Sequence, residues 1–212
     1  MKSVLIIGLS EFSKKLAYQL ASVGNSLCLV DYNEKQIEAI SSDFPNVVIG
    51  DCMNIKVLED LDASSYDYCV VGIGENLQSS LEITSNLREL GAKYIVAKAN
   101  HANQAKFLKM AGANEVIYPD EESAMKLATI INASNIIDFF RINDEYGMYK
   151  TVVPDSWAGK PLIEVDPRKN YKCNVLAIIK DGKMELPGVD TIFEKNSTLF
   201  IFGALPALKK LK

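Results

Sequence analysis

The stretch that most constrains the fold lies near the start of the chain, where an apolar run meets a glycine and then a helical pattern. Residues 4–7 read VLII, a strand-length run, and Gly8 follows directly. Apolar residues then recur every three or four positions from Phe12 to Val23, which indicates one buried helix face. This order of strand, tight turn and helix is typical of folds that hold a dinucleotide at the helix N-terminus.

The turn keeps only part of the glycine pattern G-x-G-x-x-G that such folds carry. Gly8 stands at the first glycine position, but Ser10 and Ser13 stand at the second and third. If position 10 requires a positive φ angle, a non-glycine residue there costs on the order of 1–2 kcal/mol. A side chain also hinders close approach to a phosphate. Glu11 adds a negative charge that repels phosphate, unless it points away, so we expect ATP to bind weakly.

The alternation of apolar strands and amphipathic helices continues through the first half of the chain. Further strands are predicted at residues 27–30, 46–49, 67–71, 93–97 and 115–118, with helical patterns between them. Because these strands are apolar throughout, we expect them to be buried on both faces of a parallel sheet. The sequence therefore predicts an α/β fold, a doubly wound, Rossmann-like parallel sheet over residues 1–142.

A long helical pattern from residue 121 to about residue 140 ends this first domain. Its apolar face is wider than one sheet needs, and Ile136, Ile137, Phe139 and Phe140 form surplus hydrophobic surface. We predict that this surface is a dimer contact. The alternative is that it only covers the edge of the sheet.

After Arg141 the pattern changes to short strands with turn signals, which predicts a second, smaller α+β domain over residues 143–212. Strands are expected at 149–153, 174–179, 183–186 and 198–202, followed by a short helix at 205–211. Asp181 and Gly182 form the predicted hairpin turn. A domain this small has a thin core, so we expect it to need a second copy for stability.

Polar residues follow several predicted strands of the first domain, at the edge where parallel sheets bind ligands. Asp31 ends the second strand, roughly 20 residues after Gly8, a spacing suited to a carboxylate that accepts from ribose hydroxyls. The alternative is an ordinary surface aspartate at a strand end. Asp51 ends the third strand, the stretch GIGEN at 72–76 follows the fourth, and Lys98 follows the fifth.

Composition and isolated motifs exclude several other classes of protein. The net charge is −4 and the pI about 5.2, whereas broad nucleic-acid binding requires a basic face. No apolar run approaches the ~20 residues of a membrane-spanning helix. One histidine and four dispersed cysteines do not make a zinc site. Tyr146 and Lys150 have the spacing of a reductase pair, but Gly147 interrupts the required helix, and no catalytic set assembles, so we expect no enzyme.

Several motifs, taken in order, resemble the RCK family, the regulators of K⁺ conductance. In the first domain they are GDC at 50–52, GIGEN at 72–76, AKA at 97–99, GANEV at 112–116 and PD at 119–120. In the second they are GKPL at 159–162, Arg168 and NVLAI at 174–178. The resemblance covers essentially the whole chain. It is narrowest to the Ktr/Trk-type gating subunits, with an RCK_N domain at 1–142 and an RCK_C domain at 143–212.

The resemblance implies a cytoplasmic regulatory subunit of a K⁺ transport system. Such subunits form homodimers that assemble into a ring, often octameric, which docks on a membrane K⁺-transporting subunit at the inner face of the membrane. The RCK_N domain binds an adenine nucleotide such as ATP, ADP, AMP or NAD. The matching positions here are Gly8, Ser10, Glu11, Phe12, Asp31, Asp51, Cys52, Gly74, Glu75 and Lys98. The family has GLGRFG where this chain has GLSEFS, so Glu11 replaces the arginine that reaches the terminal phosphate.

In several family members the RCK_C domain binds cyclic di-AMP at a dimer interface through an arginine and an asparagine. Arg168 and Asn174 stand at these positions, with Ile178 in the same motif and Pro187 near the pocket wall. An arginine from each copy would face the two phosphates, unless Arg168 instead forms a surface ion pair with Asp166. The resemblance makes cyclic di-AMP the leading ligand of the second domain.

Two other functions stay open from the sequence. The fold and Asp31 are compatible with an NAD-dependent oxidoreductase, although the catalytic set is missing and the turn has lost glycines. The other alternative is a structural ring subunit without a ligand. The retained Asp31, Asp51 and Lys98 count against it.

Overall fold

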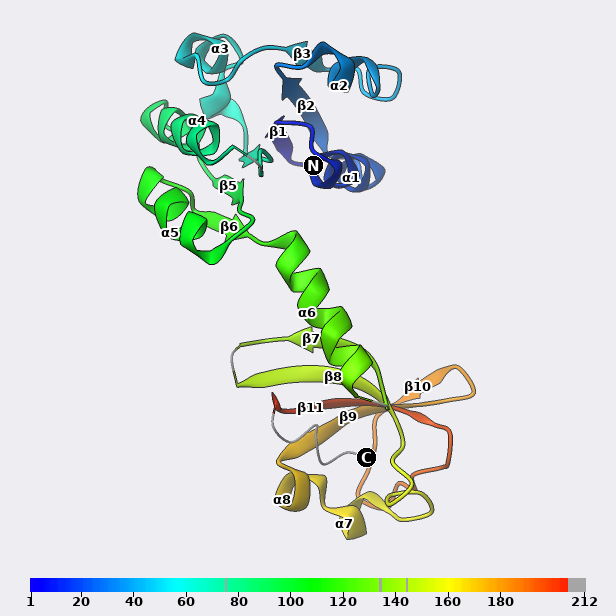
Figure 1. The fold of residues 1–212 in the computed structure, drawn as a ribbon. Coiled ribbons are helices and arrows are strands. Elements are labelled where there is room, and N and C mark those ends of the chain that lie inside the picture. The colour runs from blue at the N-terminus through cyan, green and yellow to red at the C-terminus, as the bar shows by residue number, and fades with distance from the viewer. Residues whose placement is uncertain (75, 134, 144, 206–212) are drawn as a thin grey trace. The chain divides into compact units, whose positions relative to one another are not determined.

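The computed structural model describes residues 1–74, 76–133, 135–143 and 145–205 (Figure 1). The chain divides into two compact units, Met1–Glu121 and Glu122–Lys212. Apart from Leu205, the helix predicted at 205–211 lies outside the described residues. Within the described ranges, every helix is too short or too polar to cross a lipid bilayer.

The first unit is built on a six-stranded parallel sheet with the order β3-β2-β1-β4-β5-β6. This is the order of doubly wound dinucleotide-binding folds, and the predicted fold is confirmed. The order reverses between β1 and β4, and folds of this kind bind ligands in a crevice at the carboxyl ends of these strands. The elements are β1 (Ser3–Ile7), α1 (Glu11–Ser22), β2 (Ser26–Asp31), α2 (Glu34–Glu38), β3 (Val47–Ile49), α3 (Ile55–Asp60), η1 (Ala63–Ser65), β4 (Tyr68–Val71), α4 (Leu77–Glu89), β5 (Ile95–Lys98), α5 (Ala102–Ala111) and β6 (Glu115–Ile117).

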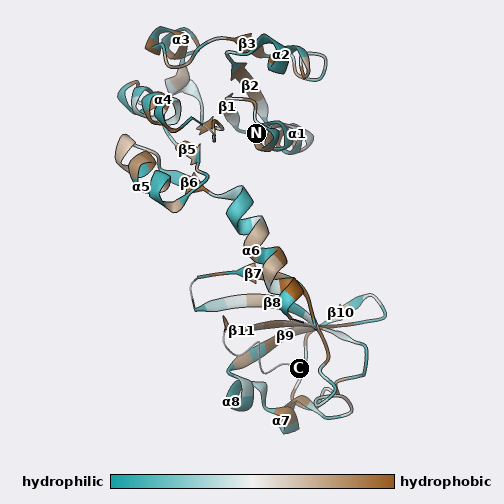
Figure 2. Cartoon of the chain, viewed as in Figure 1, coloured by the Kyte–Doolittle hydropathy of each residue, from teal (hydrophilic) through white to brown (hydrophobic). Residues whose placement is uncertain are grey.

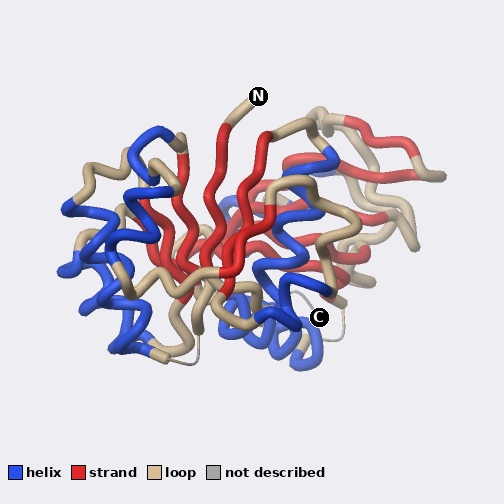
Figure 3. The backbone as a smooth tube through the Cα atoms, turned by 90° about the horizontal axis from the view of Figure 1, so that it is seen from above, coloured by secondary structure: helices blue, strands red, loops and turns tan. Residues whose placement is uncertain are grey.

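Different helices cover the two faces of this sheet (Figure 3). On one face, β1 and β2 pack against α1 and α2 through residues that include Ala17 and Ile37. On the other face, the alternate side chains of the same strands pack with Leu58 of α3, Leu87 of α4 and Leu108 of α5. Burial on both faces explains why the strands read as continuous apolar runs.

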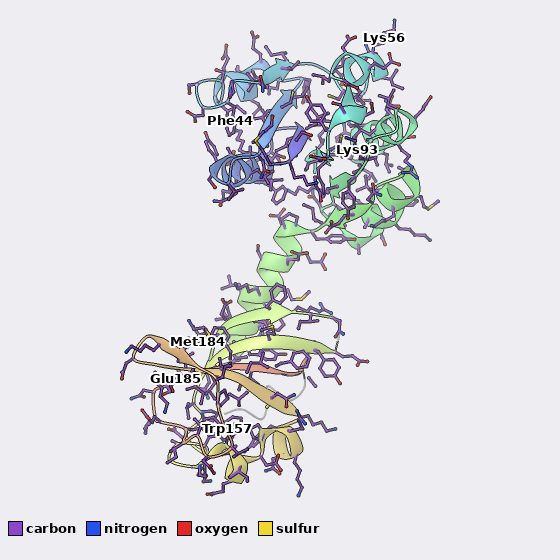
Figure 4. The ribbon with its side chains drawn as sticks, turned by 180° about the vertical axis from the view of Figure 1, so that it is seen from behind. Phe44, Lys56, Lys93, Trp157, Met184 and Glu185 are labelled. Carbon is purple, nitrogen blue, oxygen red and sulfur yellow. The ribbon has the colours of Figure 1, made fainter. Side chains whose placement is uncertain are left out.

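The second unit is built on a five-stranded sheet with the order β10-β9-β11-β8-β7, in which all pairs are antiparallel. Its core is aromatic. Trp157 is buried (Figure 4), and its ring centroid lies 5.2 Å from that of Phe193 and 5.0 Å from that of Tyr171. The elements are β7 (Ile136–Arg141), β8 (Tyr146–Val152), α7 (Leu162–Val165), α8 (Pro167–Tyr171), β9 (Cys173–Lys180), β10 (Lys183–Glu185) and β11 (Thr198–Ala204).

The prediction of one helix from 121 to about 140 is wrong in its second half. The helix α6 (Pro119–Asn132) ends earlier, and β7 follows as an edge strand paired with β8. The β7–β8 register is irregular between Ile136 and Asp138, so the buried Ile136 and Phe139 lie three residues apart, as they would in a helix. This spacing in a strand of β-branched and aromatic residues mimicked helical periodicity.

The boundary between the two units lies earlier in the chain than the predicted boundary after residue 142. The division falls after Glu121, because β7 belongs to the second sheet through its pairing with β8. Of the four residues predicted as surplus apolar surface, Ile136 and Phe139 are buried, whereas Ile137 and Phe140 are exposed. On α6 the exposed apolar residues include Leu127 and Ile131, and Figure 2 shows hydrophobic and hydrophilic residues mixed along this helix.

Candidate functional site

Gly8 makes the turn between β1 and α1, and its conformation requires a glycine. Its φ angle is +84°, and a Cβ atom at this position would lie 2.4 Å from Cγ1 of Ile73. The Gly8 N–H donates to the carbonyl oxygen of Val30 at 2.8 Å, which ties the turn to β2. Backbone geometry and packing therefore explain this glycine without any ligand.

Ser10 is the N-cap of α1 and is not strained. Its φ and ψ angles are −62° and 165°, and its hydroxyl oxygen accepts a hydrogen bond from the Ser13 N–H at 3.4 Å. The expected cost of a positive φ angle at position 10 does not arise. The serine side chain accepts from a helix N–H group here, and a glycine has no side chain that could do so.

Ser13 is fully buried and packs against Gly72, the residue that follows β4. A Cβ atom on Gly72 would lie 1.9 Å from Oγ of Ser13 and 2.9 Å from the carbonyl oxygen of Gly8. The absence of a side chain at position 72 therefore leaves room for the Ser13 side chain, and α1 approaches the sheet closely. This role of Gly72 was not predicted, although the glycines of GIGEN are its signal in the sequence.

Asp31, at the end of β2, is buried and holds the turn in place. Its Oδ2 accepts from the Leu9 N–H at 2.6 Å, and its Oδ1 accepts from the Asn33 N–H at 2.8 Å. The alternative that Asp31 is an ordinary surface aspartate at a strand end is therefore wrong. Each carboxylate oxygen can accept a further hydrogen bond, so a ribose hydroxyl remains a suitable partner.

Lys14, in α1, and Lys98, the last residue of β5, each face a carboxylate. Nζ of Lys14 lies 3.4 Å from Oε1 of Glu11, and Nζ of Lys98 lies 3.2 Å from Oδ2 of Asp120. The side chains of Lys14 and Lys98 are 20% and 12% exposed, whereas those of Glu11 and Asp120 are 83% and 82% exposed. Glu11 thus lies in the first turn of α1 with an internal partner one helical turn away.

Gly74, Lys98 and Asn100 lie together beyond the ends of β4 and β5. Nδ2 of Asn100 donates to the Gly74 carbonyl oxygen at 2.7 Å, and a Cβ atom on Gly74 would lie 3.3 Å from Nζ of Lys98. Oδ1 of Asn100 is buried and has no hydrogen-bond partner among the described residues. Asn100 was not predicted, and its signal in the sequence is a polar residue just after a strand end. The predicted Glu75 lies outside the described residues.

Asp51 and Cys52 follow β3. Asp51 is exposed and accepts from the Met53 N–H at 3.0 Å. Cys52 is buried, and this burial, with the nearby Asp51 carboxylate, raises the pKa of its thiol to about 12. Cys52 is therefore a neutral packing residue at physiological pH. Phe12, in the first turn of α1, is half-buried.

Arg168 and Asn174 come together in a pocket of the second unit. Nε of Arg168 donates to Oδ1 of Asn174 at 2.9 Å, and both residues line a pocket of about 360 Å³ between α7, α8 and the start of β9. Asp166 instead caps α8, where it accepts from the Lys169 N–H at 3.2 Å. In the part of the chain that the structure describes, Arg168 forms no ion pair, with Asp166 or any other carboxylate.

Ile178 and Pro187 do not line this pocket. Ile178 is fully buried in β9 and packs in the core that contains Trp157. Pro187 follows β10 and is half-buried. Within one chain, the structure thus brings together Arg168 and Asn174 but not the other two predicted residues.

A cavity of about 440 Å³ lies at the opposite, amino end of β2 and β3. Its lining includes Cys28, Asn46 and Tyr66 and contains no charged side chain. A nucleotide phosphate needs a cation or a set of free N–H donors, so this cavity is a poorer candidate than the crevice at the carboxyl ends.

Two family models match the chain, the TrkA-N domain over residues 4–119 and the TrkA-C domain over residues 149–212. The chain belongs to the TrkA-N/TrkA-C family. The RCK resemblance of its motifs is confirmed. It is 28% identical to the Ktr system potassium uptake protein C of Bacillus subtilis (strain 168), over 100% of this chain and 96% of that protein.

Solved structures show the same fold. The GsuK channel bound to NAD aligns with a TM-score of 0.70 and 21% identity, over 99% of this TrkA-family chain and 39% of the channel chain. The Kef CTD of Shewanella denitrificans in its AMP-bound form aligns with a TM-score of 0.54 and 24% identity, over 61% of this chain and 79% of that chain. The chain therefore spans less than half the length of the GsuK channel chain.

The geometry of the TrkA-N unit is suited to binding. The Asp31 carboxylate and Lys98 lie at the carboxyl ends of its strands, and Lys98 already has an internal partner in Asp120. Over the described ranges, no group of three or more His, Cys, Asp or Glu side chains could hold a metal ion. The one histidine, His101, is the N-cap position of α5, where its side chain forms no capping hydrogen bond.

Proposed function

We propose that this chain is the regulatory subunit of a K⁺ transport system and senses a nucleotide. The observation that carries the proposal is the match to a Ktr potassium uptake protein over the whole of this chain and nearly all of that protein. The ligand biases the subunit between two arrangements, and this bias controls the transporter. The subunit works without catalysis.

The subunit acts in the cytoplasm, at the inner face of the membrane, where it docks on a membrane K⁺-transporting subunit. Homodimers assemble into an octameric ring in this proposal. The exposed apolar residues Leu127 and Ile131 of α6 and Ile137 and Phe140 of β7 support a contact between copies, because single chains rarely leave such a surface uncovered.

An adenine nucleotide such as NAD, ADP or AMP occupies the crevice of the TrkA-N unit. Asp31 accepts from its ribose, and Gly8, Gly74 and Lys98 line its path across the carboxyl ends of β1, β4 and β5. The reversal of strand order between β1 and β4 supports this placement, as do the NAD and AMP that similar folds bind. ATP binds weakly, because Glu11 adds negative charge at the phosphate end.

Cyclic di-AMP occupies the pocket of the TrkA-C unit. Two copies of the chain each supply one Arg168, which donates from its terminal N–H groups to a phosphate while Asn174 holds Nε. The hydrogen bond at 2.9 Å orients the guanidinium, and the described residues give it no competing carboxylate. Ile178 would support the pocket from the core behind it. Pro187 would contact the ligand from the partner copy of the chain.

Two experiments test this function. Deletion of the gene in its host should slow growth at low external K⁺ and reduce rubidium uptake, and re-expression should restore both; unchanged uptake would contradict the transport role. Thermal shift of the purified chain should show stabilisation by NAD⁺, ADP or AMP and by cyclic di-AMP, with little from ATP. Stabilisation by none of these ligands would favour the ligand-free ring subunit, and hydride transfer with NAD⁺ would favour the oxidoreductase.

A further inference from the structure

Lys98 is connected to the turn between β1 and α1 through the loop that follows β4. A Cβ atom on Gly8 would meet Ile73, and a Cβ atom on the neighbouring Gly74 would lie 3.3 Å from Nζ of Lys98. Lys14 lies in the first turns of α1, which begins at the same turn. The Lys98 ammonium group therefore borders the space in which a nucleotide phosphate would lie, and Lys14 belongs to the helix whose N-terminus begins at that turn.

Each of these lysines already forms an ion pair, and its acidic partner is an exposed side chain that can move away. The acids are more than four-fifths exposed, and the lysines are at least four-fifths covered. An ion pair with one exposed partner contributes little stability, so solvent can take back the carboxylate at small cost. The lysine stays in place because its stem is packed.

We propose that Glu11 and Asp120 compete with ligand phosphates for Lys14 and Lys98, and thereby limit how much negative charge the site accepts. The inference rests on the nucleotide site proposed above. A phosphate that reaches either lysine must displace a carboxylate, which then stays nearby and repels it. The penalty grows with ligand charge, so it is smallest for AMP and NAD⁺ and largest for ATP.

Isothermal titration calorimetry on the full chain tests the competition, with AMP, ADP, ATP and NAD⁺ as ligands and without divalent cations. The variants are Glu11→Gln, Asp120→Asn and their combination. Glu121→Gln is the matched control, because it removes the same charge one residue from Asp120 and has no contact with Lys98 among the described residues. Circular dichroism and the thermal midpoint check that each variant folds.

We expect each substitution to raise the affinity for ATP roughly threefold and the combination to raise it roughly tenfold, the range that exposed ion pairs allow. The affinity for AMP should change less than about twofold, and Glu121→Gln should behave as the unmodified chain. The gains should shrink at high salt, which screens exposed charges. ATP binding seen only in the combined variant would support the competition most directly.

Other outcomes overturn the inference in distinguishable ways. If AMP or NAD⁺ binds but neither substitution changes ATP affinity more than Glu121→Gln does, the competition is wrong and the nucleotide site stands. If no variant binds any of the four nucleotides, both the competition and the site are wrong. Lys98→Met combined with Asp120→Asn gives a further check: additive effects would mean that Asp120 acts by general repulsion and not through Lys98.

Discussion

The two units treat their charged groups in opposite ways. In the TrkA-N unit, the Asp31 carboxylate accepts two backbone N–H groups, and Lys14 and Lys98 face carboxylates. In the TrkA-C unit, Arg168 hydrogen-bonds the neutral amide of Asn174 and forms no ion pair among the described residues. In the proposed complexes, a phosphate would displace a carboxylate in the first unit, whereas in the second it would meet a cation without a carboxylate partner. The unit with the nucleotide-binding fold is thus the less prepared of the two for a phosphate.

The largest expected effect comes from Gly72→Ala, which tests whether the turn of the first unit is complete without a ligand. The new methyl group would overlap the Ser13 hydroxyl and crowd the Gly8 carbonyl, so the first unit should lose about 3 kcal/mol of stability. Urea unfolding followed by circular dichroism measures this loss. Gly188→Ala is the control, because its nearest neighbour is Oγ1 of Thr191 at 3.9 Å. Equal losses in the two variants would contradict the close packing at Gly72.

Arg168→Ala tests the other half of the comparison. Loss of a charge-assisted contact to each phosphate should weaken cyclic di-AMP binding roughly 100-fold, measured by calorimetry. Lys169→Ala is the control, since it removes the same charge from the same helix but does not line the pocket. If Arg168→Ala leaves cyclic di-AMP binding unchanged, the proposal that this pocket binds cyclic di-AMP is wrong.

Asp31→Asn separates a structural role from a ligand role. The amide cannot accept from both the Leu9 and Asn33 N–H groups, so the first unit should lose about 1–3 kcal/mol of stability with no nucleotide present. Asp51→Asn, at an exposed carboxylate, should cost less than about 0.5 kcal/mol. If Asp31→Asn changes only nucleotide affinity, the turn does not depend on this carboxylate.

The smallest effect is a difference in alkaline stability between the units. Burial raises the pKa of the thiols of Cys52 and Cys69 in the first unit to about 12, and that of Cys173 in the second to about 11. A raised pKa favours the protonated folded form, so this stability is complete below pH ~9 and is lost as pH rises toward the folded values. At pH 10 the loss is on the order of 1 kcal/mol per thiol.

The first unit should therefore lose more stability than the second between pH 8 and pH 10, because it holds Cys28, Cys52 and Cys69. Urea unfolding at both pH values measures the difference. Cys69→Ala should reduce the pH dependence of the first unit and leave that of the second unchanged. An equal loss in both units would mean that groups other than the thiols control it.

Much of the first unit could be predicted because its strands are buried on both faces. Continuous apolar runs and a carboxylate after β2 were enough to give the parallel sheet and the position of Asp31. The role of Ser13 could not be predicted, because it depends on Gly72, a residue distant in sequence that only the fold brings near. Whether position 10 requires a positive φ angle could not be predicted, because a serine there can also be extended and cap the helix, as it does.

The second unit was harder to predict because its signals are local and short. The hairpin turn and most strands followed from turn residues, and the pairing of Arg168 with Asn174 fitted the motif. The irregular register of β7 hid a strand behind helical spacing, because an extra residue in an edge strand resets the alternation of buried and exposed positions. Ile178 lies in the same motif as Asn174, yet its side chain belongs to the core.

Positions 13 and 72 share one small volume between α1 and the end of β4, and the chain fills it with the serine and leaves the glycine bare. A side chain at 72 is excluded twice, by the Ser13 hydroxyl and by the carbonyl oxygen of Gly8, which would lie 2.9 Å from its Cβ atom. Glycine at 72 is therefore needed whether or not position 13 carries a side chain. A search that counts glycines only inside the turn would overlook this one, which follows β4 and decides how closely α1 approaches the sheet.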